Sequence, residues 1–277
     1  MPATNYVMED FNVSNCCYYG IINSTIQNCL FQNCKVENCN GFFPWMMGDV
    51  FSGYYGPRDG FKGTLVNCES NNNTIGGYYN YTYPGFARAG AFTLFGGDGC
   101  VFENCRAKGN SIPGFSFTKI GYVGNNMGDN QNIIMRNCIS ENNTTLDPPP
   151  AGAGSLPGHG IVTDEMNKIT IKNCILQCNE GDGVKLAGDK NLILDSVANL
   201  NDGEGFFIGG TGCTVRDSEA INNGAFGFKN TDGSNVFHGN FASSNTSGGF
   251  DGLAAANVET ADTDAGRWSN VNGVTNY

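Results

Sequence analysis

The stretch Lys172-Asn-Cys-Ile-Leu-Gln-Cys-Asn-Glu-Gly-Asp-Gly-Val-Lys-Leu186 decides the fold, because its pattern returns twice at an interval of 22 residues. It returns as Leu194-Asp-Ser-Val-Ala-Asn-Leu-Asn-Asp-Gly-Glu-Gly-Phe-Phe-Ile208 and as Arg216-Asp-Ser-Glu-Ala-Ile-Asn-Asn-Gly-Ala-Phe-Gly-Phe-Lys-Asn230. Each copy has Cys or Ser in third place, Asn in eighth, Gly in twelfth and Val or Phe in thirteenth. A fixed period of this length predicts a solenoid in which each repeat forms one coil.

The pattern continues toward the N-terminus as Asn-Cys pairs, separated by one coil plus an insertion of 15, 11 or 14 residues. Its anchor residues are Cys68, Cys105, Cys138, Cys174, Ser196, Ser218 and Asn240. Three residues earlier lies an apolar column: Leu65, Phe102, Met135, Ile171, Ile193, Val215 and Phe237. Five residues later lies an asparagine column: Asn73, Asn110, Asn143, Asn179, Asn201, Asn223 and Asn245. The first column predicts an inward stack, and the second predicts side chains that bond the peptide groups of buried turns.

Three cysteines near the N-terminus, Cys29, Cys34 and Cys39, follow at five-residue steps, which resembles a pentapeptide-repeat β-helix. We expect them to form square-cornered coils of the same stack, with Asn15-Cys16 and Asn38-Cys39 as earlier anchors. The sequence therefore predicts an all-β fold, a single-stranded right-handed parallel β-helix of about nine coils. One domain is expected over residues 1–277, with coils in 10–252 and a cap or interface segment in 253–277.

Over residues 10–252 the repeat resembles that of pectate lyases, polygalacturonases, alginate C5-epimerases and many viral or surface β-helix proteins. This resemblance implies a fold that serves enzymes and inert rods alike. Gly158-His159-Gly160 and Asn230-Thr231-Asp232 are similar to polygalacturonase motifs, but their order is inverted and the paired-Asp and Arg-Ile-Lys elements are missing. Gly160-Ile-Val-Thr-Asp-Glu165 is similar to the alginate-epimerase repeat, without that family's Asp-Pro-His-Glu element. No family's catalytic roles can therefore be carried over.

The formal net charge of −11 argues against nucleic acid or an anionic membrane surface as partner, because both would be repelled. It also counts against uronic-acid polymers, whereas cations and neutral glycans are not penalised. The sequence shows neither a signal peptide nor a stretch apolar enough to span a membrane, so we expect no membrane insertion.

The 12 cysteines are expected to be free. Thiols stacked on neighbouring coils would have parallel Cα–Cβ vectors and Cβ atoms farther apart than the ~3.8 Å of a disulfide. They would pack as small apolar groups, which favours folding in a reducing compartment, with a virion or cell surface as possible final locations. Their spacing lacks the paired CxxC of a zinc site.

Two insertions leave the coil directly after the asparagine column and should protrude from the same edge, with a groove between them. The first, residues 74–88, contains Tyr78, Tyr79, Tyr81 and Tyr83, and the other covers residues 144–157. The tyrosines suit stacking on sugar faces, and we assign them to substrate binding. Packing onto the rod as a local core is the open alternative.

Below the second of these insertions, the alignment places His159, Asp182 and Glu204 in one column on successive coils, with Lys185 alongside. These three are the candidate catalytic residues, because neighbouring carboxylates can serve as acid and nucleophile of a glycosidase, and Lys185 is a candidate substrate-binding residue. Neighbouring carboxylates also suit Ca²⁺, for which the candidate ligands are Glu180, Asp182, Asp202 and Glu204. Ordinary solvated acidic turns are the alternative.

Two functional hypotheses follow. We favour a β-helix scaffold that binds a glycan or serves as a structural component of a virion, fibre or surface. The alternative is a polysaccharide-active enzyme of glycoside hydrolase, lyase or C5-epimerase type, with its site on the edge formed by the 74–88 and 144–158 loops. A glycan is the expected partner, and a homo-oligomer, such as a trimer, is a further expectation.

Overall fold

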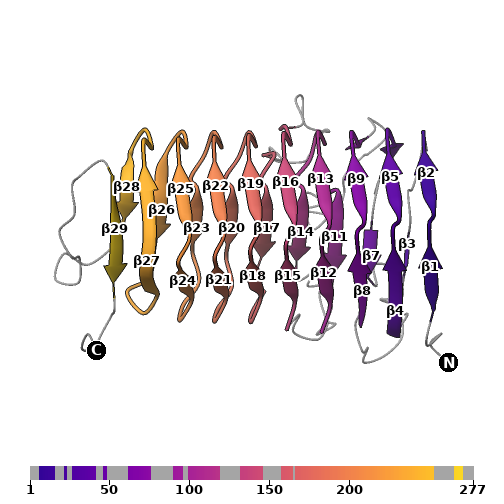
Figure 1. The fold of residues 1–277 in the computed structure, drawn as a ribbon, viewed down its shortest axis with the longest axis horizontal. Helices are drawn as coiled ribbons and strands as arrows, with labels where there is room; N and C mark the ends of the chain where they lie inside the picture. Colours follow the sequence, from indigo (N-terminus) through magenta and orange to yellow (C-terminus); the bar gives the residue numbers. More distant parts are fainter. Residues whose placement is uncertain are drawn as a thin grey trace, which may run out of the picture.

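The computed structural model describes residues 6–15, 22–23, 27–41, 46–48, 62–75, 90–95, 99–118, 132–145, 157–164, 166–252 and 265–270. The regular structure of these residues consists of β-strands alone, wound as a right-handed parallel β-helix whose coils stack along the long axis (Figure 1). The predicted fold class is confirmed. No helix in these ranges has the length and apolar character needed to cross a membrane.

A front sheet and a back sheet face each other across the core (Figure 1). The first row of the front sheet is β1 (Val7–Glu9), β4 (Gln27–Gln32), β8 (Lys62–Val66), β12 (Val101–Glu103), β15 (Ile134–Arg136), β18 (Thr170–Lys172), β21 (Leu192–Leu194), β24 (Thr214–Arg216) and β27 (Val236–Ser243). The second row is β2 (Asn12–Ser14), β5 (Lys35–Glu37), β9 (Glu69–Asn71), β13 (Arg106–Lys108), β16 (Ile139–Glu141), β19 (Ile175–Gln177), β22 (Val197–Asn199), β25 (Glu219–Ile221) and the end of β27.

The back sheet is formed by β3 (Ile22–Asn23), β7 (Met46–Gly48), β11 (Phe92–Phe95), β14 (Phe115–Thr118), β17 (Ile161–Asp164), β20 (Val184–Leu186), β23 (Phe206–Ile208), β26 (Phe226–Asn230) and β28 (Gly248–Asp251). Two short strands, β6 (Asn40–Gly41) and β10 (Thr74–Ile75), pair with each other. The front-sheet register over the described residues defines nine coils.

The two rows of the front sheet meet at a corner where one residue per coil has a positive φ. These residues are Asp10, Asn33, Asn67, Asn104, Asn137, Asn173, Asp195, Asp217 and Gly239. Asn, Asp and Gly adopt this left-handed conformation at the lowest cost, which explains why they precede every anchor. Several of the exposed amides also bond between coils: Asn67 Nδ2 donates to Asn33 Oδ1 at 3.2 Å, and Asn104 Nδ2 to Asn67 Oδ1 at 3.1 Å.

The predicted asparagine column forms a continuous buried ladder. Asn179 is typical, because its Oδ1 accepts hydrogen bonds from the backbone N–H of Asn143 at 3.2 Å and from Asn143 Nδ2 at 2.9 Å. Its own Nδ2 donates to the Ser140 carbonyl at 3.1 Å and to Asn201 Oδ1 at 2.9 Å. The ladder thus satisfies peptide groups at a corner that water does not reach.

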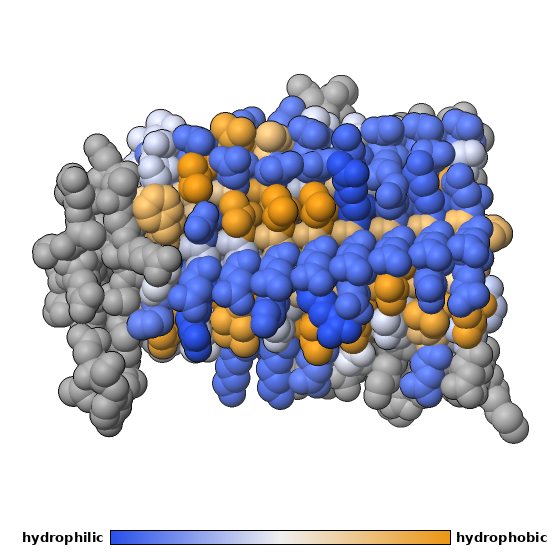
Figure 2. Space-filling view, viewed as in Figure 1, coloured by the Kyte–Doolittle hydropathy of each residue, from blue (hydrophilic) through white to orange (hydrophobic). Residues whose placement is uncertain are grey.

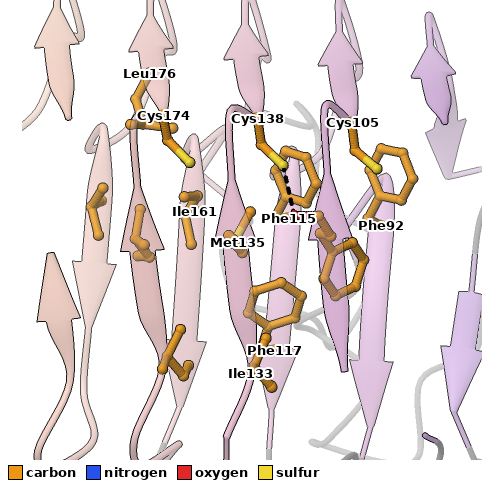
Figure 3. Packing of buried hydrophobic residues seen from close by; sticks show 14 of the residues in the cluster. Phe92, Cys105, Phe115, Phe117, Ile133, Met135, Cys138, Ile161, Cys174 and Leu176 are labelled. Atoms are coloured by element: carbon orange, nitrogen blue, oxygen red, sulfur yellow. Dashed lines mark hydrogen bonds between the residues drawn. The ribbon is translucent and has the colours of Figure 1, made fainter. Parts of the chain in front are cut away.

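The core between the sheets is filled by aromatic and thiol columns. Phe92 and Phe115 stack with ring centroids 4.8 Å apart, and the Cys105 and Cys138 side chains point toward them (Figure 3). Cys138 Sγ donates to the Phe102 carbonyl at 3.5 Å, and burial raises the pKa of the Cys105 and Cys138 thiols. Buried thiols of this kind pack as small apolar groups and are chemically inert.

The described cysteines are all free thiols, and all of them except Cys178 are buried. The expectation of an interior stack is therefore wrong for Cys178, which lies at a second positive-φ corner five residues beyond the first. A side chain at this corner points to solvent. Cys16 and Cys17 lie outside the described residues.

The N-terminal anchors require a correction of five residues. Lys35 pairs with Glu69, so Cys34, and not Cys39, occupies the anchor column with Cys68. The backbone N–H of Cys39 donates to Asn73 Oδ1 at 3.0 Å, which places Cys39 in the asparagine column. The positive-φ corners of a coil follow one another at five-residue steps, and Asn-Cys occurs at more than one of them, so the sequence pattern alone does not distinguish them.

The coils end in strand β29 (Ala265–Asn270), which pairs antiparallel with β27. Its backbone takes up the edge of the front sheet that would otherwise remain open at the last coil. β29 lies within residues 253–277, the segment predicted to follow the coils.

Candidate functional site

The site lies at the turn that leads from the asparagine ladder into the back sheet. Asp182 and Glu204 each follow a ladder asparagine by three residues, on successive coils, and His159 occupies the same place on the coil before. The turns need glycine beside these residues. A Cβ on Gly181 would come within 2.6 Å of His159 Nδ1, and one on Gly203 would collide with Asp182 Oδ1. The Gly-Asp-Gly sequence thus permits close stacking of the three side chains.

Hydrogen bonds join the three residues into a chain across the coils. The backbone N–H of Asp182 donates to His159 Nδ1 at 2.9 Å, and the backbone N–H of Glu204 donates to Asp182 Oδ1 at 2.9 Å. Asp182 Oδ2 lies 3.4 Å from His159 Nδ1. Because His159 Nδ1 accepts a hydrogen bond, the ring is neutral and carries its proton on Nε2.

Burial and local interactions shift the pKa values of His159, Asp182 and Glu204 in different directions. His159 and Asp182 are only 7% and 6% exposed. Burial, assisted by the charge of Lys185, lowers the pKa of His159 to about 4. Burial, assisted by a side-chain hydrogen bond to Glu204, raises the pKa of Asp182 to about 7. Burial also acts to raise the pKa of Glu204, but hydrogen bonds from Asp182 and Lys229 outweigh it and leave that pKa below its ordinary value.

Next to His159, Asp182 and Glu204, the outward face of the back sheet presents a row of side chains on consecutive coils: Lys185, Phe207 and Lys229. Both ammonium groups lie 5.7 Å from the centroid of the Phe207 ring. Lys229 Nζ also bonds Glu204 Oε1 at 2.9 Å. Lys185 makes no ion pair with any described residue, so its charge is available to a ligand.

The outward face of the back sheet is covered on the coils of Thr93 and Ser116, and it becomes open from Val162 onward. Thr93 and Ser116 occupy the same outward face on earlier coils but are fully buried. The chain at Gly90 covers them: its N–H donates to Thr93 Oγ1 at 2.8 Å, and its backbone lies against Ser116. Val162, Lys185, Phe207 and Lys229 retain partial exposure. We call the last three of these the lysine row.

The remaining predicted site residues have separate surroundings. Glu180 is exposed, and its Oε2 accepts a hydrogen bond from the backbone N–H of Thr145 at 2.6 Å. Thr145 is the second residue of the 144–157 insertion. Asp202 is exposed as well. The described residues contain no group of three or more His, Cys, Asp or Glu placed to hold a metal ion. Tyr78, Tyr79, Tyr81 and Tyr83 lie outside the described residues.

Sequence reasoning missed Phe207 and did not connect Lys229 to the site. Lys185, Phe207 and Lys229 recur at 22-residue intervals, one residue after the inward Val184, Phe206 and Phe228. The signal was present, since outward positions of one column must lie side by side. It was weak because their side chains differ, whereas inward columns repeat similar residues.

Opposite pH dependences are expected from the two buried groups. The depressed pKa of His159 makes folding less favourable as pH falls from 6.5 to 4, and the raised pKa of Asp182 makes folding less favourable as pH rises from 3.8 to 7. The terms oppose each other in the parent protein. Asp182→Asn removes the Asp182 contribution and leaves that of His159. The free energy of unfolding of this variant should therefore rise by about 3 kcal/mol as the pH increases from 4 to 6.5. His159→Gln should show the reverse slope. Urea unfolding at several pH values checks both, and parallel pH profiles for the two variants would refute the assignment.

The chain matches the family model described as right handed beta helix region over residues 2–195 and 154–262. It therefore belongs to the right-handed β-helix family. No curated protein matches the sequence.

Two solved structures have similar folds. One is the A-module of the mannuronan C-5 epimerase AlgE6 of Azotobacter vinelandii, with TM-score 0.62 and 14% identity, covering 91% of this chain and 62% of that module. The other is the N-terminal fragment of gene product 12 of bacteriophage phi29, with TM-score 0.56 and 10% identity, covering 90% of this chain and 45% of that fragment. The chain thus spans about three fifths or less of these structures. At such identities the likeness shows the fold alone.

Proposed function

We propose that the protein is a β-helix scaffold that binds an acidic polysaccharide along the outward face of the back sheet. The observation that carries this proposal is the lysine row, where two ammonium groups lie on either side of one aromatic ring. Ammonium groups donate charge-assisted hydrogen bonds to carboxylates. The net charge of −11 counts against such a ligand, and Lys229 is already bonded to Glu204. Lys185 therefore supplies the main local attraction, while salt screens the more distant charges.

The spacing of the row supports an extended polymer. Lys185 and Lys229 are two coils apart, on the order of 10 Å at the spacing of parallel strands. A ligand that reaches both lysines must therefore carry acid groups about two coil spacings apart along the rod, as an extended polymer with a repeated acid group can. Phe207 fills the place between them.

The test is binding of polyuronates, with dextran as the neutral polymer, measured by titration calorimetry at fixed ionic strength. Lys185→Ala should weaken polyuronate binding at least about tenfold, because an ammonium that bonds a carboxylate is lost. Lys172→Ala is the matched control, since it removes the same charge from the exposed outward face of the front sheet. Equal losses in the two variants, or equal binding of dextran, would reject the proposed site.

A polysaccharide-active enzyme is the second candidate, favoured by one observation. Asp182 and Glu204 form a hydrogen-bonded pair with pKa values displaced in opposite directions beside Lys185. Such a split is how acid and base roles are divided between two carboxyl groups. It ranks second because Asp182 and His159 are buried and their polar atoms are used in bonds between coils. Assays for new reducing ends, unsaturated uronate ends and C5 inversion, comparing the parent with Asp182→Asn, test this candidate.

A further inference from the structure

An apolar row with opposite charges at its two ends crosses the outward face of the front sheet. The strand register places Arg106, Ile139, Ile175, Val197 and Glu219 side by side on five consecutive coils. Figure 2 shows a band of apolar side chains on this face, over β16, β19 and β22, within surroundings that are mostly hydrophilic. Ile175 at its centre is 39% exposed. The described residues of the monomer leave this row uncovered.

The corner next to the row gives a second, independent observation. Its positive-φ residues are Asn15, Asn38, Asn72, Gly109, Asn142, Cys178, Leu200, Asn222 and Ser244. Apolar residues stand there only on the coil of Ile175 and on the next coil, as Cys178 and Leu200, and Leu200 is 51% exposed. A branched side chain in the left-handed region is strained where asparagine is not. Neither the backbone conformation nor burial within the monomer accounts for a leucine at this place, whereas contact with another surface does.

We propose that this face docks a second copy of the chain about a two-fold axis that passes through Ile175 and runs parallel to the strands, so that the order of the coils is reversed in the partner. The order of the row is self-complementary under that operation. Ile175 meets Ile175 of the partner subunit, Ile139 meets Val197 of the partner subunit, and Arg106 meets Glu219 of the partner subunit. A closed two-fold interface requires this kind of pairing of one patch with itself. A three-fold assembly would join two different patches, so the row supports a dimer and not the trimer expected from the sequence.

The charged side chains at the two ends of the row reach solvent, although Arg106 is already bonded to Glu141. Glu219 is exposed and makes no ion pair with any described residue. Arg106 forms an ion pair with Glu141 on the next coil of the same subunit, yet the Arg106 side chain remains 40% exposed. Because the lysine row lies on the back sheet, the dimer leaves the proposed glycan surface open, and the two proposals stand or fall separately.

Sedimentation equilibrium of the full chain at physiological salt tests the dimer. The parent should dimerise, and Ile175→Asp should raise the dimer dissociation constant at least about tenfold, because it puts two carboxylates against each other at the axis. Ile134→Asp is the matched control: Ile134 is 40% exposed on the adjacent coil but lies in the first row of the sheet. A monomeric parent at micromolar concentrations, or equal effects of the two variants, would overturn the proposal.

Charge exchange and cross-linking define the axis. Glu219→Arg should weaken the dimer, and adding Arg106→Glu should restore it. The restoration is expected even if loss of the Arg106 bond to Glu141 costs some stability, since the readout is dimerisation. In a Cys178→Ser background, Ile175→Cys should form a disulfide with its own copy on oxidation. Ile139→Cys should cross-link only when mixed with Val197→Cys. Cross-linking of Ile139→Cys with itself would place the axis elsewhere and contradict the proposed pairing.

Discussion

Asn201→Ala is expected to lower the free energy of unfolding by about 3 to 5 kcal/mol, because it removes one rung of the buried ladder. Asn201 Oδ1 accepts from the backbone N–H of Asn179 at 3.2 Å and from Asn179 Nδ2 at 2.9 Å. Its Nδ2 donates to the Leu176 carbonyl at 2.9 Å and to Asn223 Oδ1 at 3.0 Å. Alanine would remove the partner of the Asn179 backbone N–H and of the Leu176 carbonyl in a corner that excludes water, whereas Asn179 Nδ2 and Asn223 Oδ1 would each keep one other hydrogen bond. Urea unfolding followed by circular dichroism measures the loss.

Asn199→Ala is the matched control for this measurement. Asn199 lies two residues earlier on the same coil, on the outward side of β22, and its Oδ1 is buried without a hydrogen-bond partner, so no bond is lost on replacement. Its replacement should change stability by no more than about 0.5 kcal/mol. If both variants lost the same stability, the ladder would not be the source, and the effect would have to come from asparagine content in general.

The second large effect is expected at Phe206. This side chain is fully buried, and its ring stacks on Phe228 with centroids 5.0 Å apart, while Phe228 stacks on Phe250 at the same distance. Phe206→Ala should lower the free energy of unfolding by about 3 to 5 kcal/mol, because it opens a cavity between coils that the parallel strands hold at a fixed spacing. The unfolding midpoint in urea, at unchanged slope, would report this loss.

Phe207 provides the comparison, as the next residue of the same strand. Its ring points outward between the two lysines. Phe207→Ala should cost about 1 kcal/mol or less in stability, mainly the cation–π contacts, and should weaken polyuronate binding. Equal destabilisation by the two substitutions would contradict the inward and outward assignment of β23.

Much of the fold could be predicted from the sequence because inward columns repeat. The stack that contains Phe102, Met135 and Ile171 was visible at fixed offsets from Cys105, Cys138 and Cys174, since a side chain facing the core must match its neighbours on the coils before and after. The N-terminal anchors were placed at Asn38-Cys39, five residues too late. That error has a physical origin, because several corners of a coil demand a left-handed residue and Asn suits each of them.

The candidate site was predictable only in part. The 22-residue period placed Asp182 and Glu204 on neighbouring coils, which the hydrogen bond between them bears out. The period could not show that the Nδ1 atom of His159 accepts from the Asp182 backbone, or that Lys229 neutralises Glu204. These contacts depend on side-chain rotation and on how far each insertion displaces its coil.

The sequence by itself determined the coil, its period and most of the residues that face the core, with Cys178 and the N-terminal anchor as exceptions, because a repeated inward pattern constrains how the coils stack. The tertiary structure alone decided which outward residues meet and how they are charged. The pKa of Asp182 is raised to about 7 while the pKa of Glu204 is lowered, although both belong to one column. The difference comes from burial and from Lys229, which lies 25 residues beyond Glu204 along the chain and 2.9 Å from it in space. The 22-residue period of the sequence gives the position of a side chain, and the side chains of neighbouring coils determine its pKa.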